Sequence, residues 1–311
     1  MSTRPVYPAG SWRSIWSSID PHRGRLCPSP VFLWGEAHRL EAERGDDMRF
    51  TKMEGLGNDY IYLNCLEGVP EDLPGLAVRL SDRHFGVGGD GIICVCPSNR
   101  ADFRMRMFNA DGSEGAMCGN GIRCFGKYVY EKGLTDKQHL TIETLAGERE
   151  LSLMVRGKRV HAAVVDMGIP ILKSPALLQI GESKYTAVPV SMGNPHAVVE
   201  VENPAALKLQ IVGPAVEKHP AFPSRVNAEF VRVLNRTEFQ MRVWERGSGE
   251  TMACGTGACA SACAMMNAGK LDREAVVHLS GGDLTVRWDE KSGHVFMTGP
   301  AVTVFDGKLD N

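Results

Sequence analysis

The chain contains two similar stretches, FRMRMFNADGSEGAMCGNG at 103–121 and FQMRVWERGSGETMACGTG at 239–257. They align without a gap at an offset of 136 residues, and seven of the 19 aligned positions are identical. The same offset places Gly57-Asn58 on Gly193-Asn194 and Gly133 on Gly269. A chance match does not keep one register over such a distance, and the offset is far longer than the period of solenoid repeats. The chain therefore contains two copies of one domain.

Both copies have the same order of predicted elements. Alternating apolar residues predict a half-buried strand at 102–108 and at 238–244. After a Gly-rich turn, a Cys-Gly-x-Gly motif opens a predicted helix at 120–132 and at 256–268, and Gly133 and Gly269 stand where a left-handed glycine ends a helix. The second helix has little polar surface, which indicates burial on most sides. Further strands are predicted at 139–144, 151–155, 160–167, 275–279, 284–288 and 294–297.

The order of elements predicts an α+β fold of two pseudo-symmetric, duplicated domains, each a β-barrel-like sheet around a buried central helix. We expect the first domain at 48–165 and the second at 166–300, joined by a linker near 168–183. A C-terminal strand at 301–311 is expected to return to the first half. Residues 1–47 carry several prolines that break regular structure, and we expect a disordered extension there, with an organelle transit peptide as the alternative.

Composition and charge exclude several classes of protein. The chain has 35 Lys and Arg against 37 Asp and Glu, a net charge of −2, which offers no electrostatic footprint for nucleic acid or an anionic membrane. No apolar run approaches the roughly 20 residues of a membrane span. The nine cysteines are not spaced like a secreted disulfide scaffold. We therefore expect a soluble, cytoplasmic protein that binds neither nucleic acid nor membrane.

The two duplicated cysteines, Cys118 and Cys254, stand just before the predicted helices. A helix N-terminus presents unpaired N–H groups and a partial positive charge, which lower the pKa of a thiol and hold a carboxylate. Duplicated halves meet about a pseudo-two-fold axis, so we expect both thiols to face one active site in the cleft between the domains.

A thiol on each face of a ligand suits the inversion of a carbon centre. One thiolate removes a proton, the other thiol delivers one to the opposite face, and the helix amides stabilise the charge that develops on the carboxylate. Nothing in the sequence calls for a metal or another cofactor. The sequence thus favours a cofactor-independent racemase or epimerase acting on a small-molecule substrate.

The cysteines and glycines also allow other interpretations. A lone cysteine is usually an inert core residue, and this is expected of Cys27, Cys65, Cys94, Cys96, Cys124, Cys259 and Cys263. A zinc site from Cys94, Cys96, Cys118 and Cys124 lacks paired ligand spacing, and facing thiols could also close into a disulfide as a redox switch. The G-x-G-x-x-G run at 86–91 precedes a strand rather than a helix, so it is predicted to be a turn and not a dinucleotide loop.

Several separated motifs, in order, resemble the diaminopimelate epimerase family over about 48–309. They are Gly55–Tyr60, Phe108–Glu114, Cys118–Cys124, Met192–His196, Arg225–Asn227, Glu245–Gly247 leading to Ala253–Gly257, and the ending Met297–Pro300 through Asp306-Gly307.

This resemblance implies interconversion of LL- and meso-diaminopimelate in lysine and peptidoglycan precursor synthesis, by two cysteines without a cofactor, in a homodimer. It makes Cys118 and Cys254 the acid and base, and His196 and Glu245 the helpers that set their protonation. It assigns substrate binding to Asn58, Asn109, Gly119, Asn120, Asn194, Asn227, Glu245, Arg246, Gly255 and Thr256.

Two departures from the family pattern bear on details. Gly91 stands where some members carry a glutamine that touches substrate, and Phe305 replaces a tyrosine associated with dimer contacts. Two alternatives stay open: a proline or hydroxyproline racemase-like enzyme, which would not need Arg246 and so many amides for a second charged end, and a catalytically inactive binding or redox-sensing protein.

Overall fold

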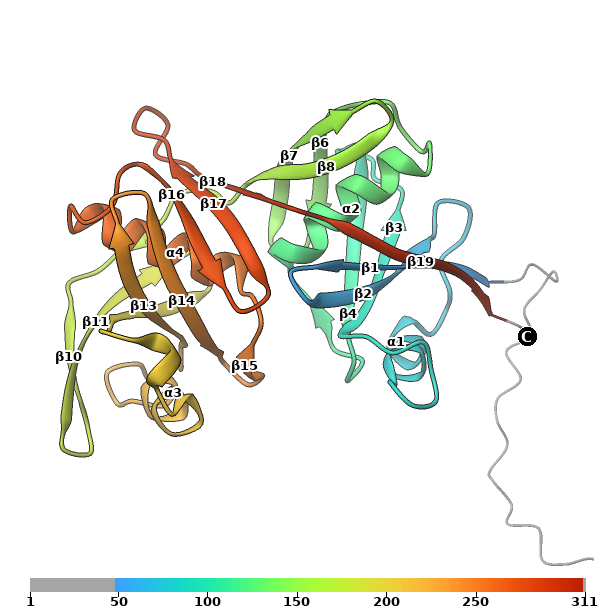
Figure 1. Ribbon diagram of the computed structural model, residues 1–311. Coiled ribbons are helices and arrows are strands. Elements are labelled where there is room, and N and C mark those ends of the chain that lie inside the picture. The colour runs from blue at the N-terminus through green and yellow to red at the C-terminus, as the bar shows by residue number, and fades with distance from the viewer. Residues whose placement is uncertain (1–47, 310–311) are drawn as a thin grey trace, which may run out of the picture. The chain divides into compact units, whose positions relative to one another are not determined.

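The computed structural model describes residues 48–309, which belong to one compact unit (Figure 1). The predicted extension at 1–47, with Cys27, lies outside the described residues.

The first half surrounds helix α2 with strands. β1 and β2 form an antiparallel pair, β2 runs parallel to β3, β3 antiparallel to β4, and β4 parallel to β6, which continues into the antiparallel strands β7 and β8. The elements are β1 (Met48–Gly55), β2 (Asn58–Asn64), α1 (Leu73–Ser81), β3 (Gly91–Cys96), β4 (Phe103–Asn109), β5 (Glu114–Gly115), α2 (Gly119–Glu131), β6 (His139–Thr144), β7 (Gly147–Arg156) and β8 (Arg159–Asp166).

The second half repeats this order around α4. β11 and β12 are antiparallel, β12 runs parallel to β13, β13 antiparallel to β14, and β14 parallel to β16, which continues into β17 and β18. The elements are β9 (Ile171–Leu172), β10 (Ala176–Ile180), β11 (Ser183–Ser191), β12 (Pro195–Glu200), a 3-10 turn (Pro204–Ala206), α3 (Leu209–Glu217), β13 (Asn227–Asn235), β14 (Glu238–Glu245), β15 (Gly249–Thr251), α4 (Gly255–Asn267), β16 (Glu274–Leu279), β17 (Gly282–Trp288), β18 (Val295–Gly299) and β19 (Val302–Leu309).

The matched strand orders confirm the predicted fold class of two duplicated α+β halves. The halves are joined through their last strands, because β8 pairs with β18 and Val165 lies opposite Met297. After β18 the chain crosses back as β19, which pairs antiparallel with β1 (Figure 1). The domain boundaries given above stay predictions.

The two central helices are themselves part of the core. Nearly every residue of α4 is buried, including Cys259 and Cys263, and α2 is buried from its first turn to Val129. Both helices end as predicted, with Gly133 and Gly269 at φ +70. Because the buried helices are fixed along their length by the surrounding strands, their N-termini are held in place.

Two parts of the fold differ from the sequence prediction. The short helices α1 and α3 were not predicted. Pro74 and Gly75 stand in the first turn of α1, and Pro214 lies inside α3. In a sequence, proline and glycine indicate the end of a helix rather than its interior. The linker expected at 168–183 contains β9 and β10, which pair with β11. Pro170 and Pro175 lie just before these strands and outside them, so neither removes a ladder hydrogen bond.

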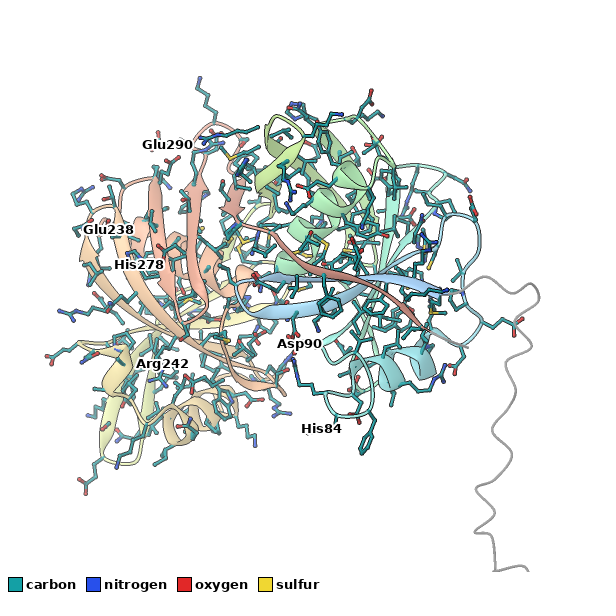
Figure 2. All side chains as sticks on the ribbon, turned by 45° about the vertical axis from the view of Figure 1, so that its right-hand side comes forward. His84, Asp90, Glu238, Arg242, His278 and Glu290 are labelled. Atoms are coloured by element: carbon teal, nitrogen blue, oxygen red, sulfur yellow. The ribbon has the colours of Figure 1, made fainter. Side chains whose placement is uncertain are left out.

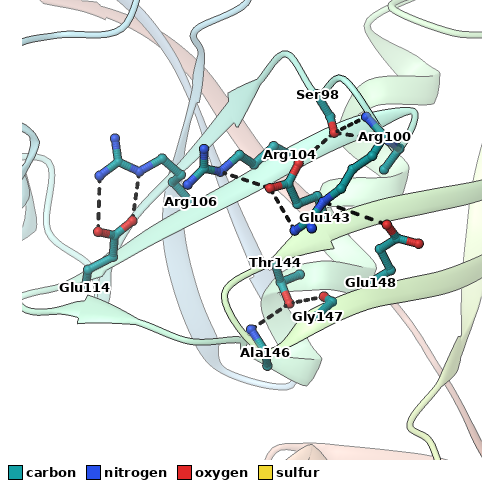
Figure 3. Close-up of polar contacts among 11 residues, drawn as sticks. Ser98, Arg100, Arg104, Arg106, Glu114, Glu143, Thr144, Ala146, Gly147 and Glu148 are labelled. Atoms are coloured by element: carbon teal, nitrogen blue, oxygen red, sulfur yellow. Dashed lines mark hydrogen bonds and ion pairs between the residues drawn. The ribbon is translucent and has the colours of Figure 1, made fainter.

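An ion pair on the strand before each central helix also repeats. Arg106 Nε lies 2.8 Å from Glu114 Oε1 (Figure 3), and at the duplicated positions Arg242 Nη2 lies 2.7 Å from Glu250 Oε1. Each pair links the two strands that precede a cysteine, β4 and β5 before Cys118 and β14 and β15 before Cys254. The duplication therefore extends to side-chain contacts beside the site.

Candidate active site

Cys118 is the N-cap of α2, and its surroundings come from the first half. Its Sγ accepts a hydrogen bond from the N–H of Gly121 at 3.3 Å. The thiol donates to Asn58 Oδ1 at 3.2 Å, and Asn58 is oriented by its own amide donating to Asp90 Oδ2 at 2.7 Å. Asp90 lies in the loop before β3 (Figure 2).

Cys254 is the N-cap of α4 and has different neighbours. Its Sγ lies 3.5 Å from Thr256 Oγ1, and the charge of Glu245, at the end of β14, acts on it. Glu245 in turn accepts from Thr251 Oγ1 at 2.5 Å. The two duplicated thiols thus sit on equivalent helix ends in unlike polar surroundings.

The N-termini of the two helices touch. A Cβ built on Gly119 would lie 3.7 Å from Gly255 Cα, and one on Gly255 would lie 3.6 Å from Gly119 Cα. Asn120 adds a hydrogen bond across the contact, from its Nδ2 to the carbonyl of Ala253 at 3.1 Å. One site therefore receives a thiol and a set of helix N–H groups from each half.

The expected lowering of the thiol pKa values is wrong. Burial raises the pKa of Cys118 above its ordinary value, although the N–H groups of Gly121 and Asn120 act in the opposite direction. Burial raises the pKa of Cys254 further, and Glu245 adds to the effect. The helix N-terminus does favour the thiolate, but loss of water around the sulfur outweighs it.

The raised pKa of Cys118 predicts how the reactivity of this thiol depends on pH. A thiol whose pKa is raised is protonated at neutral pH, and its thiolate fraction grows about tenfold per pH unit until the pKa is reached. We expect alkylation of Cys118 by iodoacetamide to be slow near pH 7 and still to accelerate above about pH 9. Peptide mapping of protein alkylated over a pH series measures this. A rate that is already constant near pH 7 would contradict it.

Three of the residues predicted to bind substrate, two amides and one arginine, form hydrogen bonds to other parts of the protein. Asn109 Nδ2 donates to Ser113 Oγ in the turn after β4. Asn227 Oδ1 accepts from the N–H of Arg246 at 2.8 Å, which fixes the backbone beside Glu245. The guanidinium of Arg246 is exposed and reaches the carbonyl of Ser224.

Asn194 and His196 form a connected group next to Cys254. Asn194 Nδ2 donates to Thr256 Oγ1 at 3.3 Å, and its Oδ1 lies 3.0 Å from His196 Nε2. Hydrogen bonds thus connect Asn58 to Cys118, and connect Thr256, Asn194 and His196 to Cys254. Glu245 acts on Cys254 through its charge.

Comparison with known families identifies the family of this chain. A family model for diaminopimelate epimerase matches residues 50–173 and 188–304. The chain belongs to the diaminopimelate epimerase family. The predicted enzyme class, an isomerase, is confirmed with it.

Curated relatives bear the same family name over nearly their whole length. The chain is 52% identical over 276 residues to a diaminopimelate epimerase of Acetivibrio thermocellus, covering 85% of this chain and 99% of the relative. It is 49% identical over 276 residues to one of Methanococcus maripaludis, covering 85% and 100%.

Solved structures of low sequence identity share the fold. A PhzF-family phenazine biosynthesis protein of Bacillus anthracis is 19% identical with a TM-score of 0.67, covering 86% of this chain and all of that one. A hydroxyproline epimerase of Agrobacterium vitis, with bound trans-4-hydroxy-L-proline, is 16% identical with a TM-score of 0.64, covering 85% and 93%.

The described residues also bear on the alternative interpretations. No group of three or more His, Cys, Asp or Glu side chains in residues 48–309 is placed to hold a metal ion. None of the described helices is long and apolar enough to cross a membrane. The G-x-G-x-x-G run is a turn leading into β3, as predicted, and a Cβ on Gly91 would lie 2.0 Å from the carbonyl oxygen of Phe108. A substrate-touching glutamine therefore has no room at position 91 of this chain.

Glu229 and Arg123 were not predicted as site residues, yet both are fully buried beside the two cysteine-capped helix ends. Arg123 reaches from α2 to the carbonyls of Gly119 and Pro300 and to Asn120 Oδ1, each at 3.1 Å. Glu229 on β13 lies 2.6 Å from His196 Nδ1. Arg123 lies within the family motif Cys118–Cys124, and Glu229 lies two residues after the motif Arg225–Asn227. Neither arginine nor glutamate is a residue type that suggests burial.

Gly257 is required by the close approach of α4 to Glu229. A Cβ at this position would lie 2.7 Å from Glu229 Oε1 and 3.3 Å from Cys254 Sγ. The carboxylate is fully buried and hydrogen-bonded, so it cannot move aside freely. We expect Gly257→Ala to lower the free energy of unfolding by about 1–3 kcal/mol, although alanine favours a helix by about 1 kcal/mol.

Chemical denaturation measures the effect of Gly257→Ala. Gly68→Ala is the matched control, because a Cβ at position 68 would meet no atom within 4 Å. Equal stability of the two variants would show that the contact with Glu229 is not tight.

Proposed function

We propose that this chain interconverts LL- and meso-diaminopimelate, without a cofactor, by moving a proton between Cys118 and Cys254. The observation that carries the proposal is the contact between two duplicated helix N-termini, each capped by a cysteine. The names and coverage of the curated relatives support the choice of substrate.

The reaction needs only these two thiols and the helix amides. The thiolate of one cysteine takes the α proton, and the electron pair of the C–H bond moves into the α carboxylate. The other thiol then delivers its proton to the opposite face of the α carbon and becomes the thiolate. The N–H groups at Gly119-Asn120 and Gly255-Thr256 stabilise the negative charge on the carboxylate in between.

The remaining roles divide between the thiols and the distal end of the substrate. His196 and Glu245 adjust the protonation of Cys254, because hydrogen bonds through Asn194 and Thr256 connect His196 to it and the charge of Glu245 acts on it. The exposed guanidinium of Arg246 binds the distal carboxylate as a fork. The side chains of Asn58, Asn109, Asn194, Asn227 and Glu245 complete the binding of the amino and carboxylate groups.

Proton NMR of the reduced protein with stereopure LL-diaminopimelate tests the proposal. We expect conversion to an equilibrium mixture with the meso isomer, with no added metal or cofactor. No conversion, with free thiols verified by titration, would overturn the proposed substrate, and L-proline and trans-4-hydroxy-L-proline would be assayed next.

We further propose that the enzyme is a cytoplasmic homodimer that associates through β19. Val302, Val304 and Phe305 on this strand are about half exposed although apolar, and Phe305 packs edge-on against Phe50. Exposed apolar side chains grouped on one strand are typical of an interface. Sedimentation of the wild type and of Phe305→Glu distinguishes a dimer broken by the new charge from a protein that is monomeric in both forms.

A further inference from the structure

A buried acid and base lie behind Cys254. The side chains of Glu229 on β13 and His196 on β12 are fully shielded from solvent, and His196 Nδ1 lies 2.6 Å from Glu229 Oε1. The duplicated positions in the first half hold Ile93 and Tyr60, so the fold itself does not require the acid–base pair. A buried carboxylate is costly unless its partner compensates it. The pair therefore serves the second half alone.

Hydrogen bonds connect this pair to the sulfur of Cys254. His196 Nε2 lies 3.0 Å from Asn194 Oδ1, Asn194 Nδ2 donates to Thr256 Oγ1 at 3.3 Å, and Thr256 Oγ1 lies 3.5 Å from Cys254 Sγ. Together with the contact between Glu229 and His196, they make four contacts that lead from Glu229 to Cys254, and we call these the Glu229 relay. Glu229 Oε2 has no hydrogen-bond partner among the described residues, so the hydrogen bonding of this carboxyl group is directed at His196.

The donors and acceptors give the Glu229 relay one direction. Asn194 Oδ1 can only accept, so His196 Nε2 must carry a proton and donate it. The Asn194 amide then donates to Thr256, which leaves the hydroxyl hydrogen free to point at Cys254 Sγ. On the other ring nitrogen, one proton lies between Nδ1 and Glu229. Without Glu229, a neutral imidazole could place its single proton on Nδ1 and leave Nε2 bare, which would break the first contact to Asn194.

We propose that Glu229 is a positioning residue that keeps the proton of His196 on Nε2 and so directs the Thr256 hydroxyl to donate to the thiolate of Cys254. The proposal rests on the proposed function and makes the two thiols unequal. Cys118 has instead the acceptor Asn58 Oδ1, which favours its protonated form. The other ionisable groups facing Cys254 are Glu245 from β14 and, through Asn194, His196 from β12.

Two variants separate hydrogen bonding from charge and packing. Glu229→Gln removes the charge but keeps an amide that can donate to Nδ1, so the relay retains its direction. Glu229→Met fills the space without any polar group. We expect Glu229→Met to lower kcat/KM about 10- to 100-fold, the effect of one hydrogen bond to a charged group, and to move the acid limb of its pH profile to higher pH. Glu229→Gln should keep the wild-type rate, and because the charge of Glu229 raises the pKa of Cys254, its acid limb should not move to higher pH.

The protonation of His196 gives a readout that does not depend on turnover. Long-range ¹⁵N NMR of histidine-labelled protein, with the His196 signals assigned by their loss in His196→Gln, should find Nε2 protonated in the wild type and in Glu229→Gln, and depleted of its proton in Glu229→Met. A wild-type His196 with a bare Nε2 would overturn the proposal even if Glu229→Met does not fold. So would a folded Glu229→Met with wild-type kinetics, or equal losses in both variants.

The two proposals fail in different ways. If the wild type does not convert diaminopimelate, the proposed function is wrong, while the NMR experiment still reports whether Glu229 sets the tautomer of His196. If the wild type is active and Nε2 is bare, only the role of Glu229 is wrong.

Discussion

Replacing Cys118 or Cys254 by alanine should lower kcat/KM for diaminopimelate about 10³-fold or more, with the fold intact. Each thiol acts on one face of the α carbon, and the loss of one general acid or base removes about 10²–10⁴ of the rate. Because inversion needs both faces in each direction, the two variants should be nearly equally impaired. Steady-state assays of reduced protein measure this.

The chain contains matched controls for the cysteine variants. Cys259 and Cys263 are buried in α4, the helix that Cys254 caps, and they contact the core rather than the site. We expect Cys259→Ala and Cys263→Ala to cost stability but to leave kcat/KM near the wild-type value. Full activity in Cys118→Ala or Cys254→Ala would contradict the two-thiol mechanism.

Replacing Arg246 by methionine should raise KM and lower kcat/KM about 10- to 100-fold, while kcat falls less. The guanidinium is proposed to hold a carboxylate remote from the reacting carbon, and a charge-assisted hydrogen bond of this kind is worth about 1.5–3 kcal/mol. A binding interaction that is equally strong in substrate and transition state affects KM more than kcat.

A control for Arg246 removes the same charge at the other end of β14. Arg236 lies in the turn between β13 and β14 and pairs with Asp272, so Arg236→Met should leave KM unchanged. Equal KM values for Arg246→Met and the wild type would contradict a distal carboxylate and favour a smaller, proline-like substrate.

The repeated sequence was enough to predict the fold class and the placement of both cysteines. The alternation at 102–108 and 238–244 and the Cys-Gly-x-Gly motifs are local signals, and local signals specify strands and helix starts well. The short helices α1 and α3 were not predicted, because the proline and glycine residues inside them are typical of turns. Their formation depends on packing against strands distant in the sequence.

The electrostatics of the site could not be predicted in the same way. A helix start indicates a stabilised thiolate, but the degree of burial around Cys254 is a property of the assembled halves. Similarly, Glu229 is an acid, a residue type that usually faces solvent. Its contact with His196 becomes visible only when β12 and β13 are placed side by side.

The position of deuterium after a brief reaction in D₂O tests the two-thiol mechanism most directly. With LL-diaminopimelate as substrate and the reaction stopped early, the meso product should carry deuterium at the inverted α carbon, because its proton comes from a thiol equilibrated with solvent. The remaining LL substrate should keep its protium, since the thiol that removed a proton returns that same proton. Deuterium appearing in recovered LL substrate as fast as in product would point to a single base and contradict the assignment of Cys118 and Cys254 to opposite faces.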